Sequence, residues 1–449
     1  MTDVVVVGGG VAGLVAAHTL ASGGVRVILL EASDHLGGTV THQTVGGLVV
    51  DAGAESFATR RGTVAALAAD LGLGDDIVTP EPAGAWLQRP EGAVPLPATS
   101  LLGIPGVPIA EDVIAVVGGR TAFRAYLDTL LPGTVGAKSK TLGELVRTRM
   151  GKNMLEKLVT PVAGGVHSAH PDELDLDRVA PGLRQAMRRE GSLARGVRDL
   201  RASAPAGSAV AGIRGGVHRI VDELAADLER LGVDVRFNQR VERVTVGSVV
   251  TATETIGGTV VVAAAGVPGA ADPVADAGDG TRVVLATLVL EAPELDAAPR
   301  GSGVLVAAGV GGIRARALTH STAKWKWLAE RAGGKHVVRL SYDPAVLDSG
   351  DSKLAETARA DAAALLGISL DPSSVLDFAR VQWTRPPAQG SAAEGVILVG
   401  EATSGTGLAA VVAQARAAAN QLLDDRAAER EAAEEEAAEE TPEGDPDPS

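Results

Sequence analysis

Cysteine is absent from the 449 residues, and aromatic side chains are scarce, with four Phe, four Trp and two Tyr. The lack of cysteine excludes disulfides, thiolate metal sites, cysteine nucleophiles and redox-active dithiols. Because so few aromatic residues are present, alanine, valine and leucine must fill the core. Any binding cavity is therefore expected to be aliphatic.

Long apolar runs are also lacking. The longest ones, around residues 4–17 and 259–271, contain Gly or Pro and fall short of the ~18 uninterrupted residues of a transmembrane helix. The opening MTDVVVV places no basic residue before its apolar run, so it does not resemble a signal peptide. These absences predict a cytoplasmic protein without a transmembrane segment.

The negative charge is concentrated in one segment. The chain has a net charge of -15, and the residues from Asp424 onward hold twelve acidic residues against two arginines. Their low hydrophobicity and high charge predict an acidic disordered tail over 424–449. Part of it, AAEREAAEEEAAEE, could instead extend the preceding helix, because Ala and Glu favour helix. The remaining residues are only mildly acidic, and nothing in them indicates nucleic-acid binding.

The segment DVVVVGGGVAGLVAAHTL predicts a strand, a tight glycine turn and a helix. Gly8 permits the turn, Gly10 lets the backbone approach a pyrophosphate, and Gly13 lets the helix pack closely on the strand. The start of the helix would direct its amides and the positive end of its dipole at the phosphates. The pattern therefore predicts a dinucleotide site.

A second predicted strand, VRVILLE, ends at Glu31, where a carboxylate can accept the ribose hydroxyls of an adenosine. Such an acid disfavours a 2′-phosphate, which argues against NADP and leaves NAD and FAD open. The pair Gly37–Gly38 follows, and a second close backbone approach after the ribose carboxylate is typical of amine oxidase-type flavoproteins. We therefore expect FAD, with Glu31 on its ribose.

The segment GVILVGEATSGTGLAAVVAQARAAANQLL, residues 395–423, predicts another strand, a glycine-rich loop and a long helix. A helix that starts near Gly405 and Gly407 could direct its amides at a flavin carbonyl and stabilise charge on the reduced ring. Residues 215–246 add a helix and two strands that return to the same sheet. The FAD domain is thus expected to be discontinuous, with Val241 at the adenine.

These segments resemble the FAD-dependent protoporphyrinogen and coproporphyrinogen oxidases within the amine oxidase-like flavoproteins. The similarity runs from about residue 3 to residue 423. GGGVAGLVAAHTL and EASDHLGG are shared by the whole superfamily. The more specific motifs are DAGAESFATRRGTVAALAADLGL (51–73), LPATSLLGIP (96–105), LVTPVAGGVHSAHPDELDLDRVAPGL (158–183), IRGGVHRIVDEL (213–224) and ALTHSTAKWKWLA (317–329).

The resemblance implies an α/β fold, with an FAD-binding Rossmann-like domain of the two-dinucleotide-fold kind, an inserted helical lobe and a substrate-binding sheet. The expected division is 1–75, 206–275 and 371–423 for the FAD domain, 76–205 for a mainly helical cavity domain, 276–370 for the sheet and 424–449 for the tail. Within the sheet region, the lysines and tryptophans of KWKW, 324–327, are compatible with a binding box, but their alternation favours a strand with one charged and one buried face.

The FAD contacts of the family carry over onto matching positions of this chain. These positions are Gly8, Gly9, Gly10, Val11, Ala12, Gly13, Glu31, Ala32, Gly38, Thr39, Gly53, Ala54, Glu55, Ser56, Val241, Trp383, Thr406, Gly407 and Leu408. Two departures accompany them. Thr39 and Thr41 follow the glycine pair where the family often has a basic residue, and the sequence around Trp383 is an imperfect copy of the family motif. A metal site is not expected, because His167 and His170 lack a third ligand.

The resemblance implies an oxidase of haem biosynthesis that converts coproporphyrinogen III to coproporphyrin III in a six-electron oxidation, with O2 as acceptor and H2O2 as product. The flavin carries the redox chemistry, so no catalytic side chain is assigned. The substrate has four propionates, so basic groups should surround the cavity. Arg60 and Arg61 are candidates, although a solvated pair at a helix start explains them equally well. Transient contact with other haem-synthesis enzymes is also expected, while the oligomeric state is left open.

Other functions stay open at this point. A protoporphyrinogen IX oxidase differs in the number of propionates it must accommodate, which depends on the geometry of the cavity. A flavin amine oxidase usually needs two aromatic walls beside the flavin. The chain has only two tyrosines that could form such walls, Tyr126 and Tyr342, which argues against this function. A desaturase usually meets membranes and lacks the more specific motifs. A flavin-binding homologue without turnover is favoured by Thr39 and Thr41.

Overall fold

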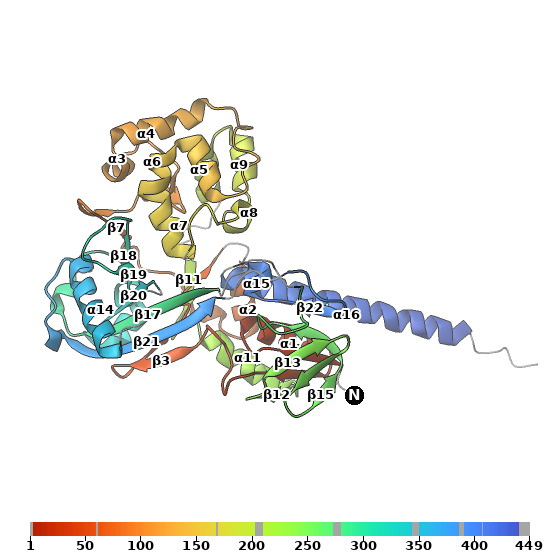
Figure 1. The fold of residues 1–449 in the computed structure, drawn as a ribbon. Helices are drawn as coiled ribbons and strands as arrows, with labels where there is room; N and C mark the ends of the chain where they lie inside the picture. Colours follow the sequence, from red (N-terminus) through yellow and green to blue (C-terminus); the bar gives the residue numbers. More distant parts are fainter. Residues whose placement is uncertain are drawn as a thin grey trace, which may run out of the picture.

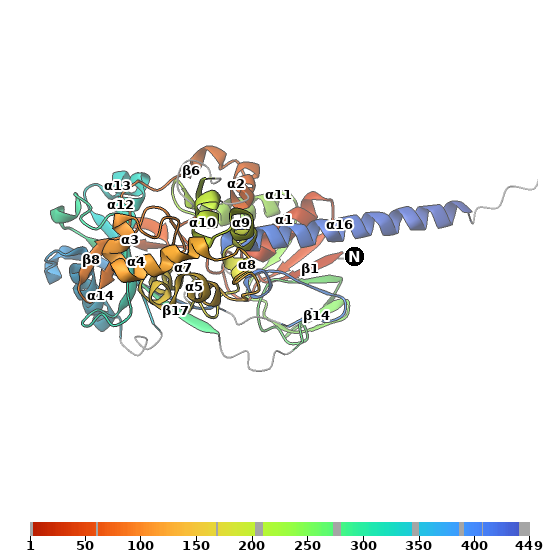
Figure 2. The same cartoon turned by 90° about the horizontal axis from the view of Figure 1, so that it is seen from above.

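The computed structural model describes residues 3–59, 62–167, 169–202, 210–272, 280–343, 350–385, 390–405 and 407–439. Three groups of elements are visible in Figure 1: a parallel sheet with helices beside it, a seven-stranded sheet, and a helical lobe. Seen from above, the long helix α16 (Leu408–Glu439) runs out beyond the other elements (Figure 2). No helix within the described ranges is long and apolar enough to cross a membrane.

The parallel sheet is assembled from segments that lie far apart in the sequence. Its order is β12-β2-β1-β16-β22, and every neighbouring pair is parallel. The strands are β1 (Val4–Val7), β2 (Val27–Leu30), β12 (Asp234–Arg236), β16 (Thr259–Val262) and β22 (Val396–Leu398). The four valines of β1 are all buried, as expected for a strand covered on both faces.

Helices pack on this sheet through small and aliphatic side chains. Leu14 and Leu20 of α1 (Val11–Ser22), Leu224 of α11 (Arg219–Arg230) and Ala415 of α16 are buried in one hydrophobic core. A three-stranded sheet, β13 (Val241–Thr245), β14 (Ser248–Thr251) and β15 (Thr255–Gly257), adds to the opposite core. The parallel strands with helices beside them confirm the predicted Rossmann-like fold.

The second sheet has seven strands in the order β21-β17-β20-β19-β18-β7-β8. They are β21 (Val375–Arg385), β17 (Thr281–Leu290), β20 (His336–Tyr342), β19 (Ala315–His320), β18 (Gly303–Val306), β7 (Trp86–Arg89) and β8 (Gly92–Pro95). All neighbours are antiparallel except β18 and β7. Helix α14 (Asp351–Leu366) buries its apolar side chains against this sheet.

The helical lobe lies at the top of Figure 1. It contains α3 (Glu111–Val117), α4 (Gly119–Tyr126), α5 (Leu142–Met150), α6 (Lys152–Met154), α7 (Thr160–His167), α8 (Leu176–Val179), α9 (Leu183–Glu190) and α10 (Leu193–Ala202), with a 3-10 turn, Leu127–Leu130, and a π-helical turn, Leu155–Val159. Leucine, valine and methionine fill its core.

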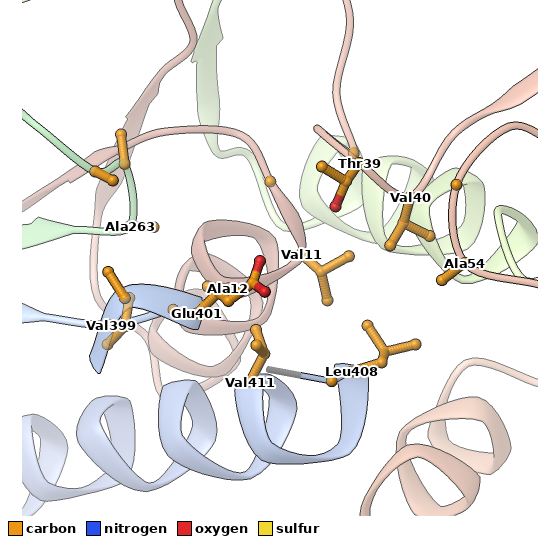
Figure 3. Close-up of a pocket in the computed structure, with 18 of the residues that line it drawn as sticks. Val11, Ala12, Thr39, Val40, Ala54, Ala263, Val399, Glu401, Leu408 and Val411 are labelled. Atoms are coloured by element: carbon orange, nitrogen blue, oxygen red, sulfur yellow. The ribbon is translucent and has the colours of Figure 1, made fainter. Parts of the chain in front are cut away.

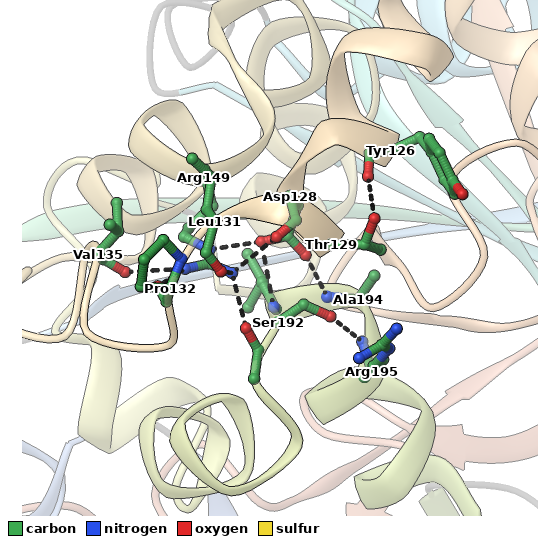
Figure 4. Close-up of polar contacts among 12 residues, drawn as sticks. Tyr126, Asp128, Thr129, Leu131, Pro132, Val135, Arg149, Ser192, Ala194 and Arg195 are labelled. Atoms are coloured by element: carbon green, nitrogen blue, oxygen red, sulfur yellow. Dashed lines mark hydrogen bonds and ion pairs between the residues drawn. The ribbon is translucent and has the colours of Figure 1, made fainter.

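Buried among these helices is an ion pair between Arg149 and Asp128, each with no exposed side-chain surface. The Asp128 carboxylate also accepts the amides of Leu193 and Ala194 at 3.2 and 2.8 Å. Arg149 donates to the carbonyls of Pro132 and Asp128 at 2.6 and 3.0 Å (Figure 4). The pair therefore ties α5, the 3-10 turn and the start of α10 together.

Shorter elements connect the three groups. The hairpin β3 (His42–Val45) and β4 (Leu48–Asp51) is followed by the three-stranded sheet β5-β11-β6. The members of that sheet are β5 (Phe57–Ala58), β11 (Val210–Ile213) and β6 (Ile77–Val78). The remaining short elements are α2 (Thr63–Asp70), the hairpin β9 (Ser100–Leu101) and β10 (Ile104–Pro105), α12 (Ser321–Lys324), α13 (Lys326–Ala332), α15 (Glu401–Ser404) and the 3-10 turns Gly74–Asp76, Pro293–Leu295 and Pro372–Ser374.

The structure differs from four sequence-based expectations. Residues 76–205 were expected to be mainly helical, but β7 and β8 within them belong to the seven-stranded sheet. β7 pairs there with β18, which lies so far along the chain that the sequence near β7 does not indicate the pairing. β21 pairs with β17 in the same sheet, whereas residues 371–423 were expected in the FAD domain. The predicted strand at 324–327 is helical on either side of Trp325. The expected disorder from residue 424 is wrong up to Glu439, and the alternative that Ala and Glu extend the preceding helix is confirmed over these residues.

Candidate functional site

The glycine turn after β1 has the geometry that the sequence predicted. Gly8 has a φ of 102°, which side chains disfavour. A Cβ on Gly13 would stand 1.9 Å from the carbonyl oxygen of Gly8, so α1 can pack here only with glycine. A Cβ on Gly10 would meet nothing within 4 Å, because this residue faces open space at the start of α1.

Glu31 lies directly beside this turn. One of its carboxylate oxygens accepts the amide of Gly9 at 2.6 Å. The other accepts the amide and hydroxyl of Ser33 at 2.8 and 2.7 Å. The end of β2 thus holds a carboxylate next to the turn after β1, which is the arrangement expected for ribose binding.

The glycine pair brings a second stretch of backbone against the first. The amide of Gly37 donates to the carbonyl of Gly9 at 2.8 Å, and Gly37 forms a bridge with Gly10. A Cβ on Gly38 would stand 3.5 Å from the Cα of Gly10. The loop after Glu31 therefore lies along the glycine turn, and its predicted approach to the cofactor stays a prediction.

A pocket of about 340 Å³ opens at the start of α1. Figure 3 shows Val11, Ala12, Thr39, Val40, Ala54, Val399, Leu408 and Val411 around it, together with the carboxylate of Glu401. Except for this carboxylate and the hydroxyl of Thr39, the labelled side chains are aliphatic. This agrees with the expectation from the scarcity of aromatic residues.

Nine of the predicted cofactor residues line this pocket: Gly10, Val11, Ala12, Thr39, Gly53, Ala54, Trp383, Gly407 and Leu408. Other predicted residues are not among its lining, namely Gly8, Gly9, Gly13, Glu31, Ala32, Gly38, Glu55, Ser56 and Val241. Thr406 and the two candidate substrate residues, Arg60 and Arg61, lie outside the described residues.

Further lining residues were missed by the sequence-based assignment. They are Val40, Ala263, Ala264, Ala265, Val399, Gly400, Glu401, Ala402 and Val411, while Gly37, which also lines the pocket, was noted only as part of the glycine pair. Most of them follow β16 and β22, whose carboxyl ends share one edge of the sheet with that of β1. Because ligands of such sheets bind outside the carboxyl ends of the strands, the residues after each predicted parallel strand could have been included.

Glu55, an expected FAD contact, instead binds cations of the protein. Its carboxylate lies 2.6 Å from Lys324 Nζ and 3.3 Å from Arg339 Nη1. Burial raises the pKa of this carboxyl, but the nearby Lys324 and Arg339 charges outweigh burial and lower the pKa from 4.5 to about 2. Glu55 therefore stays ionised, and its charge is engaged by the seven-stranded sheet and the helix beside it.

The residues around the pocket fit an FAD group. Gly10 leaves its side-chain space open at the N-terminus of α1, where a pyrophosphate can accept the free amides. Glu31 stands on one side of the turn for the ribose, and the pocket walls are small and aliphatic apart from Trp383, Glu401 and Thr39. Within the described ranges, no cluster of three or more His, Asp or Glu residues could hold a metal ion.

The family comparison agrees with this geometry. The model of the flavin-containing amine oxidoreductases matches residues 11–275, more than half of the sequence. The chain belongs to this family. As a member of the flavin-containing amine oxidoreductases, it is an FAD-dependent oxidoreductase.

One known relative is a coproporphyrinogen III oxidase, that of Mycobacterium leprae (strain TN). The two sequences are 30% identical over 400 residues, and this match covers 82% of this chain and 84% of the relative. Among solved structures, one assigned to a protoporphyrinogen oxidase from Exiguobacterium sp. 255-15 is 20% identical, with a TM-score of 0.77 over 94% of this chain and 99% of that one. Putrescine oxidase bound to putrescine is 16% identical, with a TM-score of 0.63 over 95% and 99%. These two structures confirm the amine oxidase-like fold.

Proposed function

We propose that this chain oxidises coproporphyrinogen III to coproporphyrin III with bound FAD, in the cytoplasm, as a step of haem biosynthesis. The observation that carries the proposal is the 30% identity to a coproporphyrinogen III oxidase along more than four fifths of both chains. The aliphatic pocket with its glycine turn supports the cofactor part of the proposal.

The overall reaction removes six electrons and six protons from the macrocycle and passes them to three O2, which gives three H2O2. Bound FAD supplies the hydride-accepting centre and the reaction with oxygen. The protein must hold the macrocycle against the flavin, and the parts of the pocket wall nearest the seven-stranded sheet are suited to this. Trp383 of β21 and the loop residues Gly53 and Ala54 form that part of the wall.

The four propionates of coproporphyrinogen III require cationic or hydrogen-bonding partners at the rim of the cavity. Arg60 and Arg61 follow the loop that carries Gly53 and Ala54, so we retain them as proposed propionate-binding residues on sequence grounds. Replacing both arginines with glutamine should raise KM for the four-propionate substrate by a larger factor than it raises Kd for FAD.

An amine as substrate is less well supported. Among the residues that line the pocket, Trp383 is the single aromatic side chain, whereas two facing aromatic walls are expected for a neutral amine. A protoporphyrinogen IX oxidase remains the second candidate, because Glu401, Thr39 and the aliphatic wall do not distinguish a two-propionate macrocycle from a four-propionate one.

An aerobic fluorescence assay tests the proposal. The purified protein, reconstituted with FAD, is given coproporphyrinogen III or protoporphyrinogen IX, and porphyrin fluorescence and O2 consumption are followed. Faster porphyrin formation from coproporphyrinogen III, lost when FAD is omitted, is the expected result. Preference for protoporphyrinogen IX would support the second candidate, and a yellow protein inactive with both substrates would refute both.

A further inference from the structure

Three ionic side chains meet behind the wall of the cofactor pocket. Glu55 follows the pocket residues Gly53 and Ala54, Lys324 ends α12, and Arg339 lies on β20 of the seven-stranded sheet. Lys324 donates to Glu55 at 2.6 Å, and Arg339 donates to its other carboxylate oxygen at 3.3 Å. Ser321 adds a third donor at 3.0 Å.

The cluster is directly bonded to the pocket wall. The Arg339 guanidinium donates to the carbonyl oxygen of Gly53 at 2.6 Å and lies 3.4 Å from that of Ala52. A Cβ on Gly53 would in turn stand 1.8 Å from the carbonyl oxygen of Thr39, another pocket residue. Arg339 is therefore linked by two hydrogen bonds to the loop of Ala52 and Gly53, which packs closely against Thr39 at the pocket.

The charges of this cluster do not cancel. Lys324 and Arg339 contribute two positive charges and Glu55 one negative charge. The three side chains expose only 16%, 9% and 15% of their surface, so that solvent screens them weakly. Lys324 Nζ also lies 5.0 Å from the centre of the Trp325 ring, a contact that stabilises the ammonium. The cluster itself thus carries a net charge of +1 beside a pocket that also holds the Glu401 carboxylate.

This charge lies on the flavin side of the site. Glu31 and the glycine turn would hold the adenosine and pyrophosphate, so the remaining part of the pocket, toward Trp383, Gly53 and Ala54, is where a flavin ring would lie. Reduction of a flavin adds negative charge to the ring, and a fixed positive charge in a weakly screened environment stabilises that charge.

We propose that Glu55, Lys324 and Arg339 form a charge cluster that raises the reduction potential of the bound flavin and so favours electron uptake from the substrate. The proposal rests on the flavin cofactor of the family but not on the identity of the porphyrinogen. Lys324 supplies the excess charge, Glu55 limits it, and Arg339 fixes its position against the loop of Gly53.

Two substitutions of opposite charge effect test the cluster. Lys324→Met removes a positive charge and should lower the midpoint potential of the flavin, whereas Glu55→Gln removes the negative charge and should raise it. The potential is measured on the FAD-loaded protein by anaerobic dye-coupled reduction with dithionite, without any porphyrinogen. Lys326→Met is the matched control, because Lys326 is exposed on α13 and its charge is screened by solvent. It should leave the potential unchanged.

The opposite directions of the two expected shifts in midpoint potential distinguish an effect of charge from a structural effect. A merely structural role would shift both potentials in the same direction or leave both unchanged, and either result overturns the proposal. If Glu55→Gln does not retain FAD, Lys324→Gln and Lys324→Arg carry the test: the first should lower the potential, and the second should keep it near that of the parent chain. These midpoint potentials are measured without porphyrinogen, so they test the charge cluster even if the protein does not oxidise coproporphyrinogen III. The proposed function and the proposed charge cluster can therefore be refuted separately.

Discussion

The amide of Gly9 donates a 2.6 Å hydrogen bond to a carboxylate oxygen of Glu31, 22 residues further along the chain. This contact joins the turn after β1 to the end of β2, two parallel neighbours in the sheet. It holds the carboxylate where the ribose of a dinucleotide is expected, beside the open space at Gly10.

Replacing Glu31 should therefore weaken FAD binding. Glu31→Ala removes a carboxylate that can accept the ribose hydroxyls, and hydrogen bonds to charged groups contribute about 1.5–3 kcal/mol, so Kd for FAD should rise by about 10- to 150-fold. Kd is measured by flavin fluorescence titration of the apoprotein. Glu330→Gln, an exposed position on α13, should leave Kd unchanged. An unchanged Kd in Glu31→Ala would contradict the assignment of the ribose site.

Two glycines of the same turn should separate folding from cofactor binding. Gly13→Ala places a Cβ at 1.9 Å from the Gly8 carbonyl oxygen, and the required shift should lower the free energy of unfolding by about 1–3 kcal/mol. Gly10→Ala places its Cβ in open space at a φ of -70° that alanine adopts readily. The apoprotein of Gly10→Ala should keep its stability and lose affinity for FAD. Denaturant unfolding and fluorescence titration measure the two effects, and equal stability losses would contradict this account.

The buried pair in the helical lobe should matter for stability. Arg149→Met leaves the Asp128 carboxylate buried with fewer partners, which costs about 3–5 kcal/mol. Urea denaturation should show this loss. The exposed pair between Arg147 and Asp172 provides the comparison, and Arg147→Met should cost less than about 1 kcal/mol. Similar losses in both variants would argue against a special role for the buried pair.

His320 should make stability depend on pH. Burial, together with the neighbouring His336, lowers the pKa of His320 from 6.5 to about 4. The unfolded chain then binds more protons than the folded one between these two values. The free energy of unfolding should fall by about 3 kcal/mol as the pH drops from 6.5 to 4 because of this residue.

The measurement is urea denaturation of the parent chain and of His320→Leu at a series of pH values. The variant should lose about 3 kcal/mol less than the parent chain over this range. His35→Gln, which replaces an exposed histidine, should behave like the parent chain. A fall of equal size in the parent chain and in His320→Leu would show that another group causes the pH dependence.

Local patterns in the sequence predicted the parts of the site that depend on neighbouring residues. The glycine turn and Glu31 at the end of β2 follow from strand and helix signals within 38 residues, and the structure places both beside each other. The contact of Gly37 with Gly9 was not predicted, because the glycine pair was expected against the cofactor. Contacts between segments that are far apart in the sequence could not be predicted from such local patterns. Lys324 and Glu55 are 269 residues apart, so neither residue's own surroundings in the sequence indicate their pairing.

The same distinction explains the errors in the fold. The KWKW segment alternates as a strand does, yet α12 ends at Lys324 and α13 begins at Lys326. Between them Trp325 is buried, and Lys324 forms an ion pair with Glu55. β21 joins β17 through a ladder from Thr281 to Leu290 that no local signal in residues 375–385 specifies. For α16, the alternative based on helix propensity was correct up to Glu439, because Ala and Glu outweigh the effect of charge there.

The central claim is that coproporphyrinogen III reduces the flavin of this protein, and anaerobic mixing tests it most directly. FAD-loaded protein is mixed with coproporphyrinogen III in the absence of O2, and the visible absorbance of the flavin is followed. Bleaching of the flavin in step with the appearance of porphyrin, reversed when O2 is admitted, is the predicted result. An oxidised flavin that persists with excess coproporphyrinogen III, but is bleached by dithionite, would contradict the claim.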